Sequence, residues 1–231
     1  MRPKPTTIGR FLVTGPYSSW AWRKICEVKK RLKLGYIADK WRGTDEDYTI
    51  SDGYKWLLSE TTQKVSWARI VWNRYNLPKW SFIMWLIKHQ MLLTLDRLKK
   101  MGLDVPTDCY LCGVEAETHM HLFRTCTFSK RCFQLLYSWL QIPVDILLDT
   151  DCILKIRRLS ILVRQVILAA IVGVHYGVWQ SRNIGRVEGY VTNPTHLVRL
   201  VQVDCRRRVA SEFKGSMTNF DKTWCRDHGL I

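Results

Sequence analysis

Residues 109–126 read Cys109-Tyr-Leu-Cys112-Gly-Val-Glu-Ala-Glu-Thr-His-Met-His121-Leu-Phe-Arg-Thr-Cys126, and this stretch decides how the middle of the chain folds. Three cysteines and a histidine follow the spacing C-x2-C-x8-H-x4-C, which suits the four ligands of a closed, structural zinc site. Two cysteines separated by two residues can reach one ion from a single tight turn. Gly113 follows this pair, where the chain must bend and a positive φ suits glycine. The spacing therefore predicts a structural Zn²⁺.

Three alternatives compete with this assignment. Cysteine is also a small buried hydrophobe, so these thiols could be core residues or a redox pair. His119 lies two residues before His121 and could supply the nitrogen ligand instead. Cys132 could replace Cys126, although it falls in the interior of a predicted helix. The spacing alone favours metal binding and leaves the choice of histidine open.

Net charge is the second strong signal of the sequence. The 231 residues include 36 Lys and Arg against 20 Asp and Glu, a formal net charge of +16, and the isoelectric point is near 9.7. An excess of this size is typical of proteins that bind a polyanion, most often RNA or DNA. The alternatives are a basic solvated surface, or basic patches that face an acidic protein.

The positive charge is concentrated towards the two ends of the sequence. The net charge is +6 over residues 1–50 and +7 over residues 151–231, but only +3 over residues 51–150, which contain the metal motif. We therefore expect the flanks to contact phosphates and the metal loop to serve as a scaffold. The predicted nucleic-acid contacts are Lys29, Lys30, Arg31, Lys33, Arg199, Arg206, Arg207 and Arg208.

The cysteine pattern and the apolar runs indicate an intracellular protein. Cysteines outside residues 109–126 are far apart without paired spacing, which favours a reducing compartment, nuclear or cytoplasmic. The first 26 residues are basic and free of acids, faintly like an organellar transit peptide, but Pro3, Pro5 and Pro16 oppose a helix there. The longest apolar run, residues 166–174, is shorter than the roughly 20 residues of a membrane span and is predicted to be a buried helix face.

Capping residues and apolar periodicity predict a mainly α-helical fold, a small helical domain with a knuckle-like zinc loop and flanking amphipathic helices. Thr94 is predicted to cap a helix over 95–101 that ends before Gly102, and Pro78 to begin the helix before it. Further helices are predicted over 18–34, after Ser51 or Asp52, and over 64–74, 129–140, 151–184 and 195–213. The expected domains are a basic N-terminal segment (1–47), a zinc-binding domain (48–140) and a basic helical C-terminal region (141–231).

The last predicted helix, 195–213, is amphipathic. At about 100° per residue, one face holds Leu197, Val201, Cys205 and Val209, and its arginines lie on the far side. The tail after it is expected to be weakly structured. There Cys225-x-x-His228 offers two metal ligands, too few for a site, and we expect both residues at the surface.

Six motifs follow one another along residues 48–126. They are Tyr48-Thr-Ile-Ser51, Tyr54-x-Trp56-Leu57, Trp67-x-x-Ile70-Val71-Trp72, Leu77-Pro78-Lys79-x-x-Phe82-Ile83-x-Trp85-Leu86, Leu93-Thr94-x-Asp96-Arg97-Leu98, and Cys109-x-Leu111-Cys112-Gly113-x-x-x-Glu117-Thr118-x-x-His121-Leu122-Phe123-x-x-Cys126. Together they closely resemble the reverse-transcriptase zinc-binding domain, which lies downstream of the polymerase in plant non-LTR (LINE-type) retroelements. The resemblance covers about residues 48–140. Two flanking segments also look similar, Ser19-Trp20-x-Trp22-Arg23-Lys24 and Trp179-x-x-Arg182-Asn183.

The resemblance implies roles for particular residues. In the family the ligating histidine precedes Leu-Phe, which makes His121 the third ligand beside Cys109, Cys112 and Cys126. Glu117-Thr118 also matches a family motif, and we expect it to make a turn-forming or outer contact that orients the ligand loop.

The signature of a polymerase active site does not occur in these residues. Such a site needs paired aspartates on a hairpin to hold two metal ions. Asp45-Glu46-Asp47 has acids without flanking strands, and residues 151–231 show no strand-rich ribonuclease pattern. We therefore expect a stand-alone, non-catalytic protein that binds Zn²⁺ and RNA or DNA, derived from the C-terminal part of a retroelement reverse transcriptase. The alternatives are an accessory module acting in trans with a reverse transcriptase, and a basic protein-interaction adaptor that binds no nucleic acid.

Overall fold

The computed structural model describes residues 26–30, 65–142, 159–213 and 215–231. The chain divides into two units, Met1–Lys64 and Val65–Ile231. In the first unit residues 26–30 are helical, within the helix predicted over 18–34. Two of the predicted phosphate contacts, Arg31 and Lys33, lie outside the described residues, as does the helix predicted after Ser51 or Asp52.

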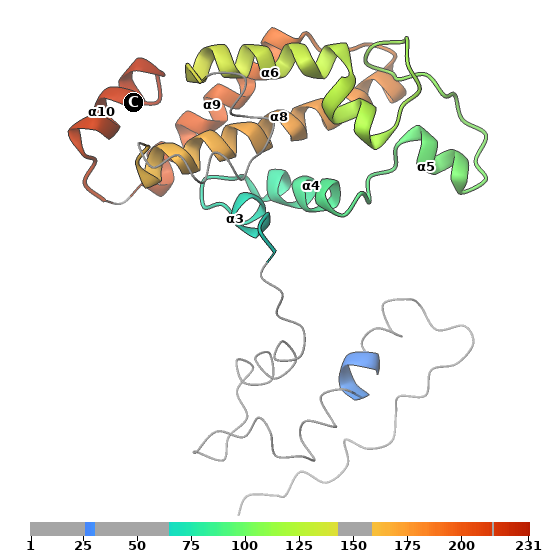
Figure 1. Ribbon diagram of the computed structural model, residues 1–231, viewed down its shortest axis with the longest axis horizontal. Coiled ribbons are helices and arrows are strands. Elements are labelled where there is room, and N and C mark those ends of the chain that lie inside the picture. Colours follow the sequence, from blue (N-terminus) through green and yellow to red (C-terminus); the bar gives the residue numbers. More distant parts are fainter. Residues whose placement is uncertain (1–25, 31–64, 143–158, 214) are drawn as a thin grey trace, which may run out of the picture. The chain divides into compact units, whose positions relative to one another are not determined.

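The second unit is mainly α-helical, as predicted. Its helices are α3 (Ala68–Val71), α4 (Pro78–Lys88), α5 (Leu95–Lys100), the π-helix η1 (His121–Thr125), α6 (Thr127–Leu140), α8 (Ile161–Glu188), α9 (Pro194–Glu212) and α10 (Asn219–Asp227) (Figure 1). The described residues form no β-strand, and a single isolated bridge pairs Asp108 with Ala116. The predicted domain boundaries at 47/48 and 140/141 stay a prediction.

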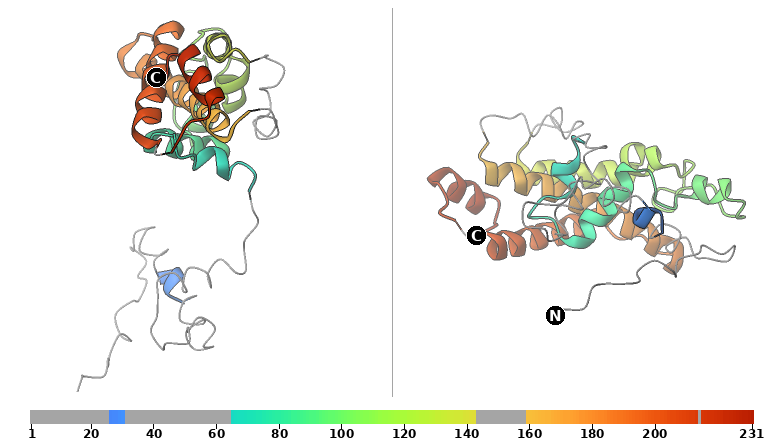
Figure 2. Two further views of the ribbon diagram at one scale, coloured as in Figure 1. Left: turned by 90° about the vertical axis from the view of Figure 1, so that its left-hand side faces the viewer. Right: turned by 90° about the horizontal axis from the view of Figure 1, so that it is seen from below.

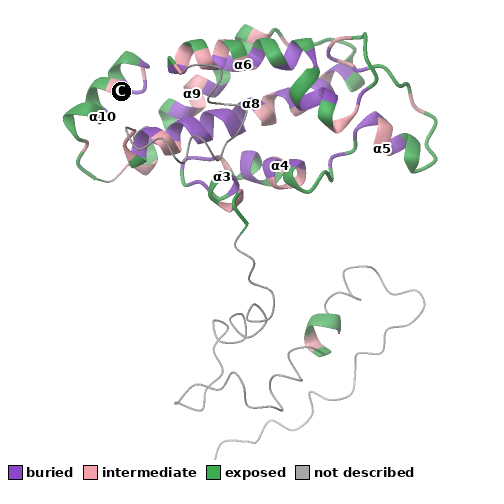
Figure 3. Ribbon diagram, in the orientation of Figure 1, coloured by how far each residue is buried: buried purple, intermediate pink, exposed green. Residues whose placement is uncertain are grey.

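Helix α8 is the centre of this unit. It contacts α3, α4, α6, α9, α10 and η1, and in Figure 2 it runs through the middle of these helices, while α5 stands apart at one end. Every residue from Val166 to Val174 is buried, which confirms the predicted buried face, and Figure 3 shows α8 as a largely buried helix. Ser160 caps its start, because the Ser160 side chain accepts a hydrogen bond from the Val163 N–H.

Helix α8 is also long and apolar enough to cross a membrane by length and composition alone. Its 28 residues include an 18-residue window with a mean hydropathy of 1.8, but 72% of that window is buried inside the protein. The buried core helix of a water-soluble protein passes the same test. The neighbouring helices of the structure therefore account for the apolar character of α8 without a bilayer.

Two glycines allow α8 to approach its neighbours closely. A Cβ atom on Gly173 would lie 2.9 Å from the Trp80 ring of α4 and 2.9 Å from Val201 of α9. A Cβ atom on Gly177 would lie 2.8 Å from the Leu197 side chain. Real Cβ contacts are longer than this, so α8 packs against α4 and α9 at a distance that only glycine permits.

Helix α4 begins where predicted, and α5 ends one residue before its predicted bound at 101. Pro78 occupies the first turn of α4, and Gly102 follows α5 with φ +84°. Thr94 is the N-cap residue of α5, as predicted, but its side chain makes no capping hydrogen bond, and this part of the prediction is wrong. Thr94 donates to the Asp96 carboxylate (2.6 Å), while the Leu95 N–H at the start of α5 donates to the side chain of Glu117 (3.0 Å).

The helix predicted over 64–74 is much shorter in the structure. Helix α3 has only four residues, Ala68–Val71. Asn76 ends it, because the side-chain amide of Asn76 donates to the carbonyl oxygens of Ile70 (2.8 Å) and Val71 (3.0 Å). Asparagine side chains compete with the helical backbone in this way, a local effect that apolar periodicity does not reveal.

The tail after α9 is ordered, contrary to the sequence-based expectation. Thr218 and Asp221 form a capping box that begins α10. Cys225 and His228, expected at the surface, are both buried. The His228 carbonyl accepts a hydrogen bond from the Trp139 indole N–H (3.1 Å), and Asp221 accepts one from Ser160 (2.5 Å). These contacts with α6 and the start of α8 hold the tail in place.

Candidate metal centre

A tight knuckle presents the first two cysteines. The Gly113 N–H donates to the Cys109 carbonyl (2.8 Å), which closes the Cys-x-x-Cys turn, and Gly113 adopts φ +66° as its place in the sequence predicted. On either side, the N–H groups of Cys109 and Glu117 donate to the carbonyls of Glu115 and Thr107 (2.8 Å each). The turn therefore folds back on itself through backbone hydrogen bonds alone.

The other two ligand candidates come from the helical segment that follows. His121 is the first residue of η1, and the Thr118 hydroxyl accepts a hydrogen bond from its N–H (3.0 Å). Cys126 stands at the start of α6, and its N–H donates to the His121 carbonyl (2.8 Å). Thr118 thus fixes the beginning of the segment, as expected for the Glu117-Thr118 pair.

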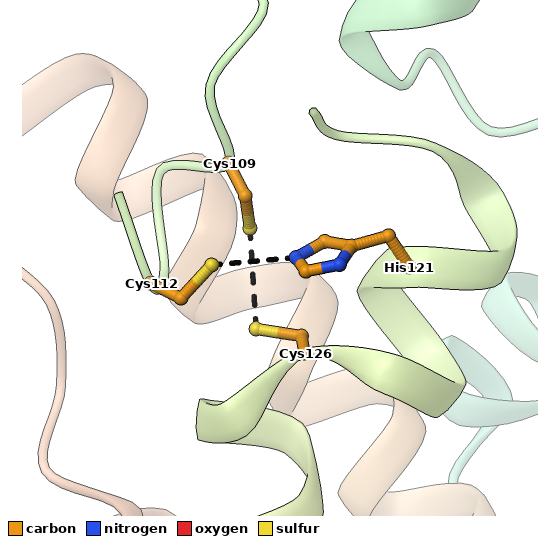
Figure 4. A group of neighbouring side chains, drawn as sticks. All are labelled: Cys109, Cys112, His121 and Cys126. Carbon is orange, nitrogen blue, oxygen red and sulfur yellow. Dashed lines mark hydrogen bonds between the residues drawn. The ribbon is translucent and has the colours of Figure 1, made fainter. Parts of the chain in front are cut away.

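These four side chains converge on one point (Figure 4). Their sulfur and nitrogen atoms all lie within 4.8 Å of one another, with Cys109 Sγ 4.0 Å from Cys126 Sγ and Cys112 Sγ 3.3 Å from His121 Nε2. Zinc–sulfur bonds of about 2.3 Å and zinc–nitrogen bonds of about 2.0 Å place tetrahedral ligand atoms roughly 3.5–3.8 Å apart. The donor set and its spacing therefore fit a tetrahedral zinc ion.

The site is largely buried. Cys109, His121 and Cys126 are buried, and Cys112 is half-buried. A structural zinc site uses all four positions for protein ligands, whereas a catalytic one keeps a position open for water. Among the residues that the structure describes, this is the one cluster of three or more His, Cys, Asp or Glu side chains that could hold a metal ion.

His121 is oriented by two contacts on its other ring nitrogen. Nδ1 lies 3.0 Å from a carboxylate oxygen of Glu115 and 3.1 Å from the Thr125 hydroxyl. Such outer contacts fix the tautomer of a ligating histidine and point the free nitrogen at the metal. Sequence reasoning missed Glu115 and Thr125, because the spacing of the ligands carries no signal for them.

The competing residues point elsewhere. The His119 ring packs against Phe123 at 5.2 Å, and burial lowers the pKa of His119. Cys132 is buried in the interior of α6, where desolvation raises the pKa of its thiol to about 12. The structure thus brings His121 and Cys126, rather than His119 and Cys132, to the other two cysteines.

The two most buried sulfurs of the cluster, those of Cys109 and Cys126, share a hydrogen bond. This bond with Cys109, followed by the N–H groups of Ser129 and Phe128 at the start of α6, lowers the pKa of Cys126 to about 5. The same bond and burial raise the pKa of Cys109. A helix N-terminus favours a thiolate, the form of cysteine that binds metals, so the two N–H groups at the start of α6 add to the effect of the Cys109 hydrogen bond.

Glu117 faces away from the four ligands. Its side chain is fully buried and accepts hydrogen bonds from the Leu95 N–H and from Arg182 of α8, whose Nη2 lies 2.6 Å from Oε1. Its carbonyl accepts from the Asp96 N–H (3.2 Å). The turn-forming role expected for Glu117 is therefore only part of its function, since it joins the metal loop to α5 and α8.

The predicted phosphate contacts lie in different environments. On α9 Arg199, Arg206 and Arg207 are exposed, opposite the buried face predicted for this helix. Arg206 donates to the Gly229 carbonyl, and Arg207 lies 3.8 Å from Asp204. In the first unit Lys30 is exposed and Lys29 half-buried.

Arg208 differs from the other arginines of α9. One of its guanidinium nitrogens donates to Glu212 (3.0 Å) and another to the Arg74 carbonyl (2.8 Å). Its side chain therefore connects α9 with the turn after α3, and it is less available for a phosphate than Arg199 or Arg207.

Residues 48–133 match the sequence model of a protein family described as zinc-binding in reverse transcriptase. The matched segment contains all four residues of the Cys109–Cys126 cluster and ends inside α6. No curated protein and no solved structure matches the chain.

Proposed function

We propose that Cys109, Cys112, His121 and Cys126 hold one structural Zn²⁺. The observation that carries this proposal is the buried convergence of three sulfurs and one imidazole nitrogen within 4.8 Å, inside a segment that matches a zinc-binding family. Zinc in such a site stabilises the fold and carries out no chemistry of its own.

The zinc proposal is tested by metal content. Reduced, purified protein is expected to contain one zinc per chain, and His121→Ala to lose it while His119→Ala keeps it. Cys112→Ser is expected to lose the metal and Cys132→Ser to retain it. No zinc in the wild-type protein, or the reverse behaviour of the two histidine variants, would refute this ligand set.

We further propose that the protein binds RNA or DNA through phosphate contacts, and that it derives from the region downstream of the polymerase in a plant LINE-type retroelement. The net charge of +16 and the exposed arginines of α9 support binding to a polyanion. The family match and the motifs of residues 48–126 support the origin.

Salt dependence tests the nucleic-acid proposal. Each lost phosphate contact lowers the slope of log K against log salt concentration by roughly 0.7–0.9. The double variant Arg199→Gln/Arg207→Gln is therefore expected to lower the slope by about 1.4–1.8 and to weaken binding to all sequences alike. The matched control is Lys130→Gln/Arg131→Gln, two exposed residues of α6 near the metal centre.

The outcome also separates the alternatives. If the α6 variant loses binding to RNA or DNA and the α9 variant keeps it, the region of the metal loop is the nucleic-acid-binding surface. A wild-type protein that binds no RNA or DNA at low salt would favour the protein-interaction adaptor. Stimulation of a partner polymerase in a template-primed assay would favour the accessory module acting in trans.

We also propose that these 231 residues have no polymerase or nuclease activity of their own. The support is the absence of a paired-aspartate motif from the sequence. A highly purified preparation is expected to show no magnesium-dependent synthesis or cleavage. Activity that is lost in Asp45→Asn or Asp47→Asn would contradict this.

A further inference from the structure

The metal loop is joined to the central helix by a buried ion pair. Arg182 of α8 donates to both carboxylate oxygens of Glu117, from Nε at 2.9 and 3.0 Å and from Nη2 at 2.6 Å. The side chains are 1% and 0% exposed, respectively, and 65 residues separate them along the chain. Burial this complete is rare for a charged pair, because both groups give up hydration.

The Glu117 carboxylate also completes the start of α5. Oε1 accepts the Leu95 N–H, which would otherwise lack a partner at the helix terminus. The negative charge is therefore balanced by a guanidinium on one side and by the first turn of a helix on the other. Glu117 thus ties together three segments, the metal loop, α5 and α8.

Arg182 contacts the metal loop at a second point. Its guanidinium lies over the ring of Tyr110 (5.8 Å to the ring centre) and over that of Trp179 (5.0 Å), and its Nη1 donates to the Asn183 side chain (3.0 Å). Tyr110 sits between ligands Cys109 and Cys112 in the sequence. Arg182 therefore contacts the knuckle at Tyr110 and just after the knuckle at Glu117.

We propose that Glu117 and Arg182 are positioning residues for the metal site, and that the metal-binding unit is discontinuous. The unit consists of the loop at residues 107–126 together with the part of α8 around Arg182, which lies beyond the segment matched by the zinc-binding family. This inference rests on the proposed zinc site. It assigns to α8 the task of holding the two halves of the ligand set in register.

The test measures the affinity of the full chain for zinc, by competition with a chromophoric chelator. Arg182→Met removes the charge and the fork of donors at similar length, and it is expected to weaken zinc binding about 10–100-fold, as losses of outer contacts do. Arg182→Lys keeps a charge without the bidentate geometry, and its zinc affinity is expected to lie between those of the wild type and Arg182→Met. Cobalt(II) absorption of each variant reports the ligand geometry directly and should change in Arg182→Met.

Two controls separate positioning from general loss of stability. Val178→Ala shortens a fully buried side chain one turn earlier on α8 and leaves both charges of the pair in place. It is expected to lower the melting temperature and to leave the zinc affinity and the cobalt spectrum unchanged. Arg186→Met changes an exposed arginine one turn later, which forms no ion pair with any described residue. This variant should change neither the zinc affinity nor the cobalt spectrum.

A double variant keeps the test decisive if Arg182→Met alone fails to fold. Glu117→Gln/Arg182→Met removes both charges, so that no unpaired charge stays buried, and the amide oxygen of the new glutamine would still accept the Leu95 N–H. This variant is expected to be folded by circular dichroism and still to bind zinc about 10–100-fold more weakly. Wild-type zinc affinity in the folded double variant would overturn the inference while leaving the zinc site in place. A wild-type protein without stoichiometric zinc would overturn both.

Discussion

The metal loop and the helix pair α8–α9 are held together by different forces. In the loop, residues 107–126, the order comes from turn hydrogen bonds, side-chain contacts such as Thr118 to His121, and four converging ligands. In the helix pair, it comes from continuous buried apolar faces and from close approach at Gly173 and Gly177.

The stability of the two regions therefore depends on different factors. The loop buries fewer apolar side chains than the helix pair, chiefly Leu111, Leu122 and Phe123, so the proposed ion and the polar contacts would add to the stability that this small core supplies. The helix pair needs no ion, but it tolerates little change in side-chain volume. Experiments that remove the metal, change the pH or add a methyl group should therefore affect one region more than the other.

Removal of zinc is expected to have the largest effect, and to fall on the loop. Structural zinc sites contribute on the order of 10 kcal/mol of apparent binding free energy, which the loop cannot replace. Chelation, or Cys112→Ser, should abolish amide hydrogen-exchange protection over residues 107–126, while residues 166–174 of α8 stay protected. Equal loss of protection in both segments would contradict the idea that only the loop depends on zinc.

Acid is expected to have the second largest effect, through a contact between the two regions. His175 of α8 packs against Phe123 at 5.7 Å and Phe133 at 5.0 Å. Burial, with Lys88 and Arg124 nearby, lowers the pKa of His175 to about 4. In the unfolded chain its pKa is about 6.5, so below that pH only the unfolded state takes up the proton.

The free energy of unfolding should therefore fall as the pH drops from 6.5 to 4, by about 3 kcal/mol in total, with no contribution from His175 above pH 6.5. Urea denaturation of wild type and His175→Gln over this range checks the sign. Both proteins contain every other titratable group, so the difference between the two curves isolates His175. Parallel curves would exclude this residue as a source of acid sensitivity.

An added methyl group at Gly173 should destabilise the helix pair and spare the loop. Overpacking costs about 1–3 kcal/mol, and the better helix propensity of alanine returns at most about 1. With the full return, Gly173→Ala should therefore lower the free energy of unfolding by up to about 2 kcal/mol with one zinc still bound. Gly185→Ala on the same helix is the control, since its nearest neighbours lie at 3.5 Å, and it should be neutral or stabilising.

The smallest effect is expected at the cap of α10. Thr218→Ala removes the hydroxyl that accepts the Asp221 N–H (3.1 Å), at a cost of about 1 kcal/mol. Thr223→Ala, an exposed position within α10, should cost less. If the two variants unfold at the same denaturant concentration, the capping box is not what begins this helix.

The sequence predicts local features well. Pro78 marks the start of α4, Gly102 follows the end of α5, and Gly113 adopts a positive φ. The four-residue spacing of Leu197, Val201 and Cys205 predicts the buried face of α9. Each of these follows from residue type and spacing within a few positions. Spacing also predicts the group of candidate ligands, but it leaves His119 and His121 equivalent, and the resemblance to a known family selects His121; the zinc itself stays a prediction.

Features that depend on distant residues could not be predicted. Glu117 caps α5 in place of Thr94, because a tertiary contact from 22 residues away supplies the acceptor. Its partner Arg182 is more remote still, 65 residues from Glu117. The prediction of a weakly structured tail is wrong for another reason. The capping box of Thr218 and Asp221 is a local pattern, but the helix that it begins, α10, is short. This helix is held in place by contacts with α6 and the start of α8, which the sequence does not reveal.

Asp221 has a consequence for the order in which the chain acquires its structure. This carboxylate accepts hydrogen bonds from Thr218 in its own capping box and from Ser160, which lies 61 residues earlier and begins α8. A contact over so long a separation forms only after the intervening segment has been brought together, because loop closure costs entropy before the contact repays it. Helix α10 should consequently dock late in folding, be the first helix to detach under mild denaturation, and expose Trp139 to quenchers before the remaining core opens.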